Sequence, residues 1–464
     1  MILWLTIFSI TNDLRPAFTR KATYLWFLTA LMGFLIRADL KGVTSIVRAL
    51  GLKAASYDLL RNFFHSSSVD CEKLCQIWLN IVLKTFPTVT EQGKPVVILD
   101  GIKIPKEGKK MPAVKKTFQQ SESNSKAEFI MGHSFQAFGV LCESNNYCFC
   151  TPVMARIHEG IKTANWDQRT LIDKANDMLQ SQFDQPFLLI ADAYYANRKM
   201  FKAAVESGSS IISRVRNNAV AYEEPEPPKT KKRGRPKLYG KKIQLASLFE
   251  SSESFVNAAS PVYAENNVEI SYLSIELLWK PTGRKVRFVL VKHPLRGNII
   301  LISSDLEMPG IDIIRLYSLR FKIEVTFKQA IHSVGAFGYH FWMARMEKLK
   351  RHNGTQHLHR KSEAYRKAIE RKMRAYHLFV TTGFIAQGLL QYLAMTKTKE
   401  VWRYYGSWIK TIRPNVLPSE SIVKNALGEA LPEFLQGTGE SSALVKFIDR
   451  HSDAIRGFKF KRPA

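Results

Sequence analysis

Three acidic residues stand where carboxylates could perform chemistry together. Asp100 follows the apolar run PVVIL, Asp192 follows the apolar run PFLLIA, and Glu324 interrupts the basic stretch RLYSLRFKIEVTFKQ. A carboxylate that ends an apolar strand is costly to bury unless a cation or hydrogen bonds satisfy it. Three converging carboxylates suit Mg²⁺, which prefers hard oxygen ligands. Two such ions about 4 Å apart can activate a water or a 3′-hydroxyl and stabilise the leaving oxygen of a phosphodiester.

Each acid also has a structural alternative. Asp100 precedes Gly101 and could be a turn residue, and Asp192 could be the N-cap of a helix over residues 196–206. Glu324 could form ion pairs with Arg320 and Lys328, four residues before and after it, worth roughly 0.3 kcal/mol each. The presence of all three acids favours a shared cation over three separate accidents.

The spacing in residues 315–329 predicts one helix with two stripes. The apolar stripe is Leu316, Leu319, Ile323, Phe327 and Ala330. The second stripe lies about 100° around the helix, and it is Tyr317, Arg320, Glu324 and Lys328. Glu324 is therefore expected between a cation one turn before it and another one turn after it.

The elements that must position the two aspartates indicate an α/β fold with a mixed sheet. The predicted order is three strands, a helix, a strand, a helix and a strand, over residues 94–105, 129–143, 147–157, 166–180, 186–195, 197–208 and 210–216. Open α/β sheets bind ligands at the C-terminal ends of their strands. Asp100 and Asp192 are expected there.

Helical regions and a β-rich insertion surround this core. Residues 42–64 have the outline of a helix-turn-helix, although two short helices joined by a glycine occur in any bundle. Alternating residues predict antiparallel strands at 268–279 and 284–293, and a basic helix is predicted through 345–379. The predicted domains are a helical DNA-binding region at 1–90, a core at 91–220 and 301–395, an insertion at 221–300, and a helical region at 396–464.

The composition points to a polyanionic partner. The chain has 68 Lys and Arg against 40 Asp and Glu, a net charge of +28, and neutralising phosphates releases condensed counterions. A membrane surface is the competing polyanion, but the longest apolar run, residues 24–36, is too short to span a bilayer. The opening MILWLTIFSI lacks the features of a signal peptide. Five cysteines without a zinc spacing indicate free thiols in the reducing cytoplasm.

These residues resemble those of the bacterial insertion-sequence DDE transposases of the cut-and-paste type. That group has the signature Tyr-x2-Arg-x3-Glu-x6-Lys, and Tyr317, Arg320 and Glu324 match its first three positions. Ile331 occupies the lysine position, and Lys328 is the candidate substitute. The resemblance also covers Asp100 in VILDG, Asp192 in IADAYY and the insertion before the glutamate, about residues 90–395 in all.

The resemblance implies a ribonuclease-H-like fold, flanked by helical regions and interrupted by the β insertion. It implies Mg²⁺, with Mn²⁺ as a substitute, held by Asp100, Asp192 and Glu324 at a single catalytic site. The implied reactions are hydrolysis at transposon ends and strand transfer into target DNA, with hairpin formation left open. The implied assembly is a homodimer that bridges two DNA ends in a synaptic complex.

Several basic segments are candidates for DNA binding. Residues 233–237, RGRPK, resemble the AT-hook core, so Arg233, Arg235 and Lys237 are candidates for a narrow minor groove or for plain phosphate attraction. Lysines after Asp100 could line the cleaved strand or belong to a solvated loop: Lys103, Lys106, Lys109, Lys110, Lys115 and Lys116. Arg214 and Arg216 share one strand face, where phosphate contact competes with ion pairing.

One tryptophan and a set of histidines each have a functional and a structural interpretation. In related enzymes an aromatic residue of the insertion stacks on a flipped base, and Trp279 lies in the matching region, although a core tryptophan is the favoured alternative. Four histidines could bind metal, but a basic helix surface is the favoured interpretation for the last three: His133, His352, His357 and His359.

Two other functions remain compatible with the sequence. One is a ribonuclease-H-like nuclease that cuts without joining, which would not require the helical flanks. The other is a catalytically inactive DNA-binding protein derived from a transposable element, which the departure at Ile331 keeps open. Terminal inverted repeats in the flanking DNA would distinguish a transposase from both.

Overall fold

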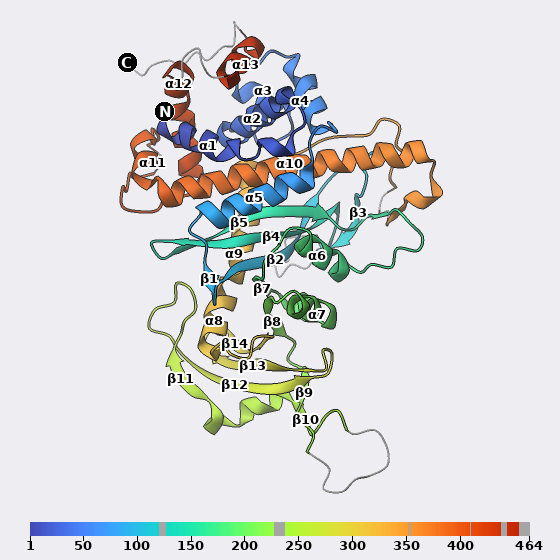
Figure 1. Cartoon of the computed structure of the whole chain (residues 1–464), viewed down its shortest axis with the longest axis vertical. Coiled ribbons are helices and arrows are strands. Elements are labelled where there is room, and N and C mark those ends of the chain that lie inside the picture. Colours follow the sequence, from blue (N-terminus) through green and yellow to red (C-terminus); the bar gives the residue numbers. More distant parts are fainter. Residues whose placement is uncertain are drawn as a thin grey trace. The chain divides into compact units, whose positions relative to one another are not determined.

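The structure is a computed structural model that describes residues 1–119, 127–226, 237–350, 352, 354–408, 410–437 and 443–453. It contains two compact units (Figure 1). The first unit comprises Met1–Thr88, Gly101–Gln168 and Ile323–Ala464. The second unit comprises Val89–Asp100 and Arg169–Lys322. Each unit is therefore built from segments that are distant in the sequence.

The second unit is built on three parallel strands. β2 (Lys94–Pro105) pairs with β7 (Leu188–Ala191), and β7 pairs with β8 (Ser210–Val215). All four residues of β7 are buried, as expected for a parallel strand covered on both faces. The helices before and after β7 are α6 (Leu171–Gln180) and α7 (Arg198–Glu206). Both start at side-chain caps, Thr170 for α6 and Asn197 for α7, which fixes where each crossover begins.

Antiparallel strands extend this sheet beyond β8. β14 (Gly297–Ser303) pairs with β8, β13 (Arg284–His293) pairs with β14, and β12 (Glu269–Trp279) pairs with β13, all antiparallel. The shorter strands of this region are β9 (Val220–Tyr222), β10 (Lys242–Gln244) and β11 (Val256–Ala259), with 3₁₀ turns η3 (Leu245–Glu250) and η4 (Ser252–Ser254). A further short strand, β1 (Thr90–Glu91), pairs antiparallel with β2. The predicted antiparallel strands of the insertion are confirmed.

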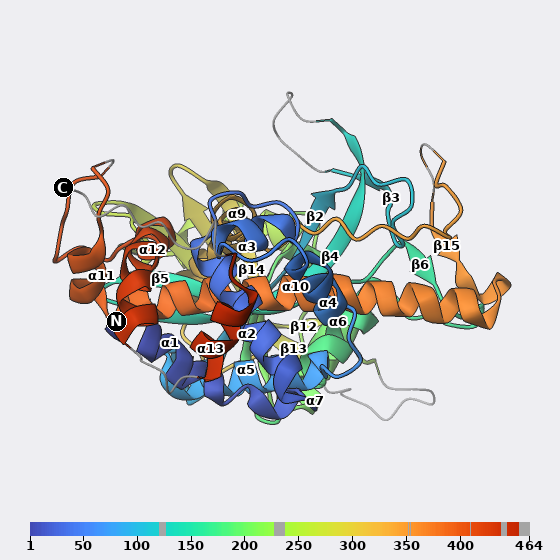
Figure 2. The ribbon, with the colours of Figure 1, turned by 90° about the horizontal axis from the view of Figure 1, so that it is seen from above.

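The first unit packs helices against a long β-hairpin. β4 (Phe129–Ser144) pairs antiparallel with β5 (Tyr147–Ile157), and α10 (Glu363–Thr396) packs on β5, α2 (Lys21–Ile36) and α5 (Cys71–Thr85) (Figure 2). The other elements of this unit are α1 (Ile2–Asn12), η1 (Arg15–Ala17), α3 (Thr44–Ala49), α4 (Ser56–Phe64), β3 (Lys115–Phe118), β6 (Ile161–Lys162), η6 (Ala330–Val334), β15 (Gln356–His357), η7 (Leu358–Arg360), α11 (Thr398–Tyr404), α12 (Glu420–Gly437) and α13 (Ala443–His451). The pair α3 and α4 has the predicted helix-turn-helix outline, and its DNA-reading role stays a prediction.

The prediction of a helix from residue 345 is wrong for its first half. α10 begins at Glu363, and the described residues between 345 and 362 contain only the short elements β15 and η7. An Asn-Gly pair at 353–354 is a turn signal that interrupts a helix. The Ser362 side chain then accepts the Tyr365 N–H and caps the start of α10.

Among the described residues, α10 is the one helix long and apolar enough to cross a membrane by length and composition. Its apolar stretch is 94% buried inside the protein. A core helix passes the same test, and the burial favours that role for α10.

The chain order of the core is the predicted one: β2, β4, β5, α6, β7, α7, β8. β2 contributes to both units, because its first part pairs with β7 and its part beyond Asp100 belongs to the first unit with β4. The strand has the predicted bounds, 94–105, and continues for five residues past Asp100, which was expected at its C-terminal end. The predicted fold class is confirmed as a mixed α/β sheet with helices, interrupted by a β-rich insertion and flanked by helical regions. Its ribonuclease-H-like character stays a prediction.

Candidate active site

Asp100 and Asp192 emerge from neighbouring strands at the same level. The last paired residues of β2 and β7 are Leu99 and Ala191, so the two aspartates are the next residues in the same parallel register. Adjacent strands lie about 4.8 Å apart, and residues in register point to the same face. The apolar runs that bury β2 and β7 therefore deliver two carboxylates side by side within the second unit.

Arg320 forms an ion pair with Asp100. Its Nη1 lies 3.0 Å from Asp100 Oδ2, and the two side chains are only 22% and 17% exposed. Arg320 belongs to η5 (Leu319–Phe321), the 3₁₀ turn that follows α8 (Gly310–Ser318). A partly buried pair is screened less by solvent than a surface pair, so this cation is a substantial part of the electrostatic environment of Asp100.

Asp192 is held by hydrogen bonds on both its side chain and its backbone. Its Oδ1 accepts the Tyr194 N–H at 3.0 Å, which caps the 3₁₀ turn η2 (Ala193–Tyr195). Its backbone carbonyl accepts the Ser213 hydroxyl at 2.8 Å. Asp192 is therefore an N-cap, as the structural alternative proposed, but it caps η2. The helix α7 is capped by Asn197 instead. Capping through Oδ1 fixes the orientation of the carboxylate.

The Tyr317 hydroxyl interacts electrostatically with two aspartates and two arginines of the site. Burial raises the pKa of its hydroxyl above the ordinary value, Arg320 and Arg214 lower it, and Asp192 and Asp100 raise it. The hydroxyl therefore stays protonated at neutral pH and can donate a hydrogen bond. Its position on α8, one turn before Arg320, brings both side chains to the same face.

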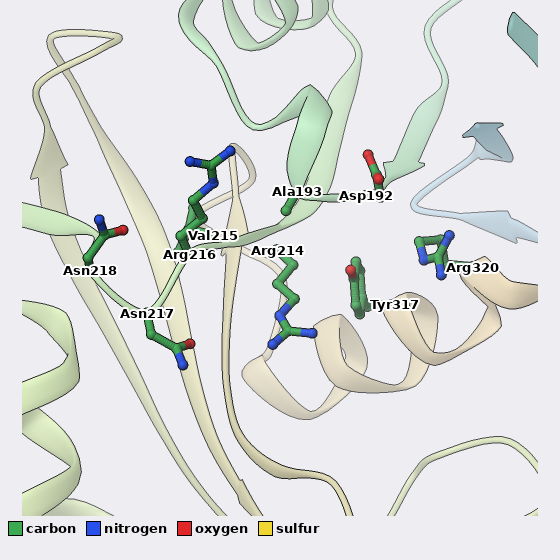
Figure 3. Close-up of a pocket in the computed structure, with 9 residues that line it drawn as sticks. All are labelled: Asp192, Ala193, Arg214, Val215, Arg216, Asn217, Asn218, Tyr317 and Arg320. Atoms are coloured by element: carbon green, nitrogen blue, oxygen red, sulfur yellow. The ribbon is translucent and has the colours of Figure 1, made fainter. Parts of the chain in front are cut away.

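An open pocket of about 610 Å³ joins these groups to the exposed face of β8 (Figure 3). Arg214 and Arg216 are exposed and alternate with the buried Val215, so they share that face. The lining residues are Asp192, Ala193, Arg214, Val215, Arg216, Asn217, Asn218, Tyr317 and Arg320. Guanidinium groups can bind a phosphate bidentately, and here they lie beside a carboxylate. Asn217 and Asn218 were missed by the sequence reasoning, although polar residues directly after a buried strand were a signal for them.

The residues of this site fit a hard divalent cation. In the part of the chain that the structure describes, no three His, Cys, Asp or Glu side chains are grouped so that they could hold an ion. Mg²⁺, however, commonly binds through one or two carboxylates together with substrate phosphates and water. Asp100 and Asp192 supply two such carboxylates in adjacent register.

Glu324 lies on α9 (Lys322–Gln329), in the first turn after η5, and its side chain is exposed. The predicted helix over 315–329 is therefore divided into α8 and α9 by the 3₁₀ turn η5. Its predicted apolar stripe is buried throughout: Leu316, Leu319, Ile323, Phe327 and Ala330. Lys328 is exposed on the same helix. The roles of Glu324 and Lys328 stay predictions.

Comparison with known families decides the class of protein. The sequence profile described as DDE superfamily endonuclease matches residues 13–267, more than half of the chain. The chain belongs to this endonuclease family. The matched range contains Asp100 and Asp192 and ends before Tyr317, Arg320 and Glu324.

Two other comparisons add little to this assignment. No curated protein matches the chain. A solved piggyBac transposase, in a synaptic complex with hairpin DNA, is 11% identical over 96% of this chain and 78% of its own, with a TM-score of 0.37. A structural similarity this low does not support an inference about fold or function.

The lysines of this DDE-superfamily chain that follow Asp100 have varied surroundings in the first unit. Lys103 Nζ donates to the Phe118 carbonyl at 2.6 Å, Lys115 pairs with Glu159 at 3.2 Å, and the ammonium of Lys116 lies 4.1 Å from the ring centroid of Phe129. Their DNA-binding role stays a prediction. Lys237 is exposed, and Arg233 and Arg235 lie outside the described residues.

Lys106 has a structural role rather than the solvent-facing one considered for it. It is buried, and its Nζ donates to the carbonyls of Phe337 and Tyr339 at 2.6 and 3.1 Å. Burial lowers the pKa of Lys106 to about 7. The carbonyl contacts hold the segment after α9 against the end of β2, which Lys106 directly follows.

Trp279 and His133 both lie in the core. Trp279 is 6% exposed and meets the Phe201 ring edge-on at a centroid distance of 5.0 Å, so it cannot stack on a base in this conformation. The proposed stacking role is corrected to the core alternative, because the indole fills space between β12 and α7.

His133 is fully buried, with Nδ1 at 2.7 Å from the Tyr339 hydroxyl and Nε2 at 2.8 Å from the Pro112 carbonyl. Burial lowers the pKa of His133 to about 3.

Proposed function

We propose that this endonuclease is a transposase that cleaves DNA at the ends of a mobile element and transfers the strands into target DNA. The observation that carries the proposal is the placement of Asp100 and Asp192 in adjacent register, beside Tyr317, Arg320 and Arg214. Membership of the DDE superfamily endonucleases and the net charge of +28 support it.

The proposed metal ligands are Asp100, Asp192 and Glu324, with Mg²⁺ as the natural ion and Mn²⁺ as a substitute. When bound, the ion supplies Lewis acidity that activates a water or 3′-hydroxyl and stabilises the leaving oxygen. The hydrogen bond from Tyr194 orients the Asp192 carboxylate, and Arg320 orients Asp100. The Tyr317 hydroxyl donates a hydrogen bond to a phosphate oxygen.

The proposed substrate is double-stranded DNA. Arg214 and Arg216 contact phosphates at the pocket, and Lys328 substitutes for the lysine of the resembling transposases. The residues proposed for further backbone or minor-groove contacts are Lys103, Lys115, Lys116, Arg233, Arg235 and Lys237. The proposed working form is a homodimer, and the proposed location is the cytoplasm, where free cysteines such as the five of this chain are common.

Cleavage of a labelled duplex that carries the element's end tests the proposal. We expect the native protein to cut at the end with Mg²⁺ or Mn²⁺, to stop when the metal is chelated, and to lose at least about 10²-fold in rate in Glu324→Ala. Glu370→Ala, which removes another exposed glutamate on a helix of the first unit, is the matched control and should keep full activity.

The products of the same reaction distinguish the other functions. Cut ends that join to a target plasmid support the transposase. Cutting without joining under conditions that support synapsis would indicate a nuclease, and specific binding without any cutting would indicate an inactive DNA-binding protein. Full activity in Glu324→Ala would remove Glu324 from the proposed ligand set.

A further inference from the structure

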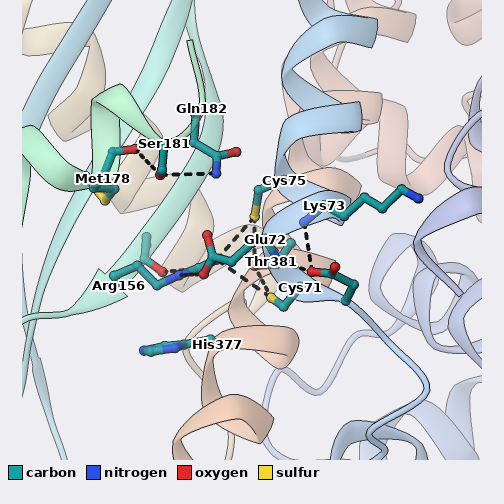
Figure 4. A network of polar contacts seen from close by, with 12 residues as sticks. Cys71, Glu72, Lys73, Cys75, Arg156, Met178, Ser181, Gln182, His377 and Thr381 are labelled. Atoms are coloured by element: carbon teal, nitrogen blue, oxygen red, sulfur yellow. Dashed lines mark hydrogen bonds and ion pairs between the residues drawn. The ribbon is translucent and has the colours of Figure 1, made fainter. Parts of the chain in front are cut away.

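Away from the carboxylates, the first unit holds two thiols around one guanidinium group (Figure 4). Cys71 is the first residue of α5, and Cys75 follows one turn later. Arg156 reaches them from β5, with Nη2 at 3.8 Å from Cys71 Sγ and 3.6 Å from Cys75 Sγ. Thr381 of α10 adds a hydroxyl at 3.7 and 3.6 Å from the same sulfurs. Three elements thus converge on one pair of thiols.

The guanidinium is fixed in place by other contacts. Arg156 Nε and Nη2 donate to Glu72 Oε1 at 3.0 and 2.9 Å, and Nη1 donates to its neighbour's carbonyl, Ala155 O, at 3.0 Å. The side chain of Arg156 is only 15% exposed, whereas that of Glu72 is 62% exposed. The positive charge is therefore held in the interior beside the sulfurs, while the carboxylate that balances it is largely in solvent.

The two thiols are unequal. The hydrogen bond with Cys75 lowers the pKa of the Cys71 thiol most, and Arg156 and Thr381 lower it further, against burial and Glu72. The same hydrogen bond and burial raise the pKa of Cys75. Cys71 is also the more accessible of the two, being half-buried where Cys75 is fully buried. Cys71 is thus the thiol of the pair that forms a thiolate more readily, and Cys75 is its hydrogen-bond partner.

The other cysteines lack this environment. Cys142, Cys148 and Cys150 lie on β4 and β5 and are buried. Burial raises the pKa of Cys142 to about 12 and also raises that of Cys150. A thiolate, not a thiol, is the reactive form of cysteine. The contrast makes Cys71 the one cysteine of the five with both access and a neighbouring cation.

We propose that Cys71 and Cys75 form an oxidation site at which a peroxide converts the pair into a disulfide. The Cys71 thiolate attacks one peroxide oxygen, an S–O bond forms, the O–O bond breaks, and hydroxide or an alkoxide leaves. The Cys75 sulfur then attacks the sulfenic sulfur, the S–S bond forms, and the S–O bond breaks. The oxygen leaves as water with the Cys75 proton.

The helix geometry is compatible with closing the pair. Residues four apart on a helix have a rise of about 6 Å between them, within the range of roughly 4.4–6.8 Å found for the Cα atoms of disulfides. Because Cys71 is the first residue of α5, opening of the first turn alone can adjust its side chain. The sulfur that must move is at the end of the helix, not in its middle.

Alkylation of the native full-length chain with N-ethylmaleimide tests the first half of the proposal. Peptide mass spectrometry is expected to show Cys71 modified at least about tenfold faster at neutral pH than Cys142, Cys148 or Cys150. Arg156→Gln should slow Cys71 by at least about twofold, since a rise of one unit from a pKa of about 6 lowers the thiolate fraction at neutral pH from about 0.9 to about 0.5. Cys148→Ser is the matched control and should not change the rate. Labelling of Cys71 as slow as that of the other three would overturn the proposal.

Treatment with hydrogen peroxide tests the second half. Trypsin cuts after Lys73, between the two cysteines, so a disulfide keeps the flanking peptides joined until a reductant is added. In Cys75→Ser, which leaves Arg156 and Cys71 in place, the sulfenic acid at Cys71 should accumulate and be trapped by dimedone. Separate peptides from the native protein, together with no dimedone adduct in Cys75→Ser, would exclude the site.

Discussion

Replacement of Asp192 by asparagine is expected to lower DNA cleavage by about 10³-fold or more, with DNA binding nearly unchanged. Asparagine has the shape of aspartate, and its Oδ1 can still accept the Tyr194 N–H that caps η2. The fold around β7 should therefore persist. What is lost is one negative charge beside Asp100, and with it the attraction for a divalent cation.

The measurement is single-turnover cleavage of a labelled end duplex, with binding followed separately by fluorescence anisotropy. Asp177→Asn is the matched control, since Asp177 lies in the same unit and pairs at 3.1 Å with Arg169 on an exposed part of α6. It should cleave at the native rate. If Asp192→Asn also cleaves at the native rate, the carboxylate pair is not the catalytic centre.

The second large effect is expected for Arg320→Gln, which removes the cation 3.0 Å from Asp100. Asp100 is only 17% exposed, so the loss of this partner leaves a partly buried carboxylate with less compensation for its charge. We expect cleavage to fall by about 10²-fold, because the Asp100 carboxylate loses the contact that orients it. Arg320→Lys should recover part of the rate, since it restores the charge without the planar fork.

Arg315→Gln separates this effect from a general loss of helix contacts. Arg315 lies on α8 and pairs with Glu91 at 2.9 Å and with Asp312 at 3.3 Å. Cleavage rates and thermal unfolding are measured for all three variants. Equal losses of cleavage in Arg320→Gln and Arg315→Gln would mean that Arg320 contributes only to stability.

The aspartates were predictable because local patterns specify buried strands. The run before Asp192 is wholly apolar, and β7 is wholly buried. The faces of the helix around Tyr317 and Arg320 were predictable for a similar reason, because a period of 3.6 residues needs no knowledge of the neighbours. The 3₁₀ turn between α8 and α9 was not, since a run of good helix formers does not reveal where hydrogen bonds tighten.

Features that depend on packing between distant segments could not be predicted. Lys106 follows a strand among exposed lysines, and only the carbonyls of Phe337 and Tyr339 make it a buried residue. The same holds for Arg156, which lies more than 80 positions from Cys71 in the chain and meets it only when β5 packs near α5. Strand alternation places Trp279 on one face of β12 but does not say that α7 covers that face.

The most direct test of the proposed catalytic site is to locate Mn²⁺ by anomalous X-ray scattering in crystals of the protein bound to DNA that carries the element's end. We expect an anomalous peak from manganese bound to carboxylate oxygens of both Asp100 and Asp192, with a Glu324 oxygen completing the protein ligands. The peak should be absent in Asp192→Asn crystals grown in the same way. A well-ordered complex with no peak between the two aspartates, or with manganese bound elsewhere, would contradict the proposed site.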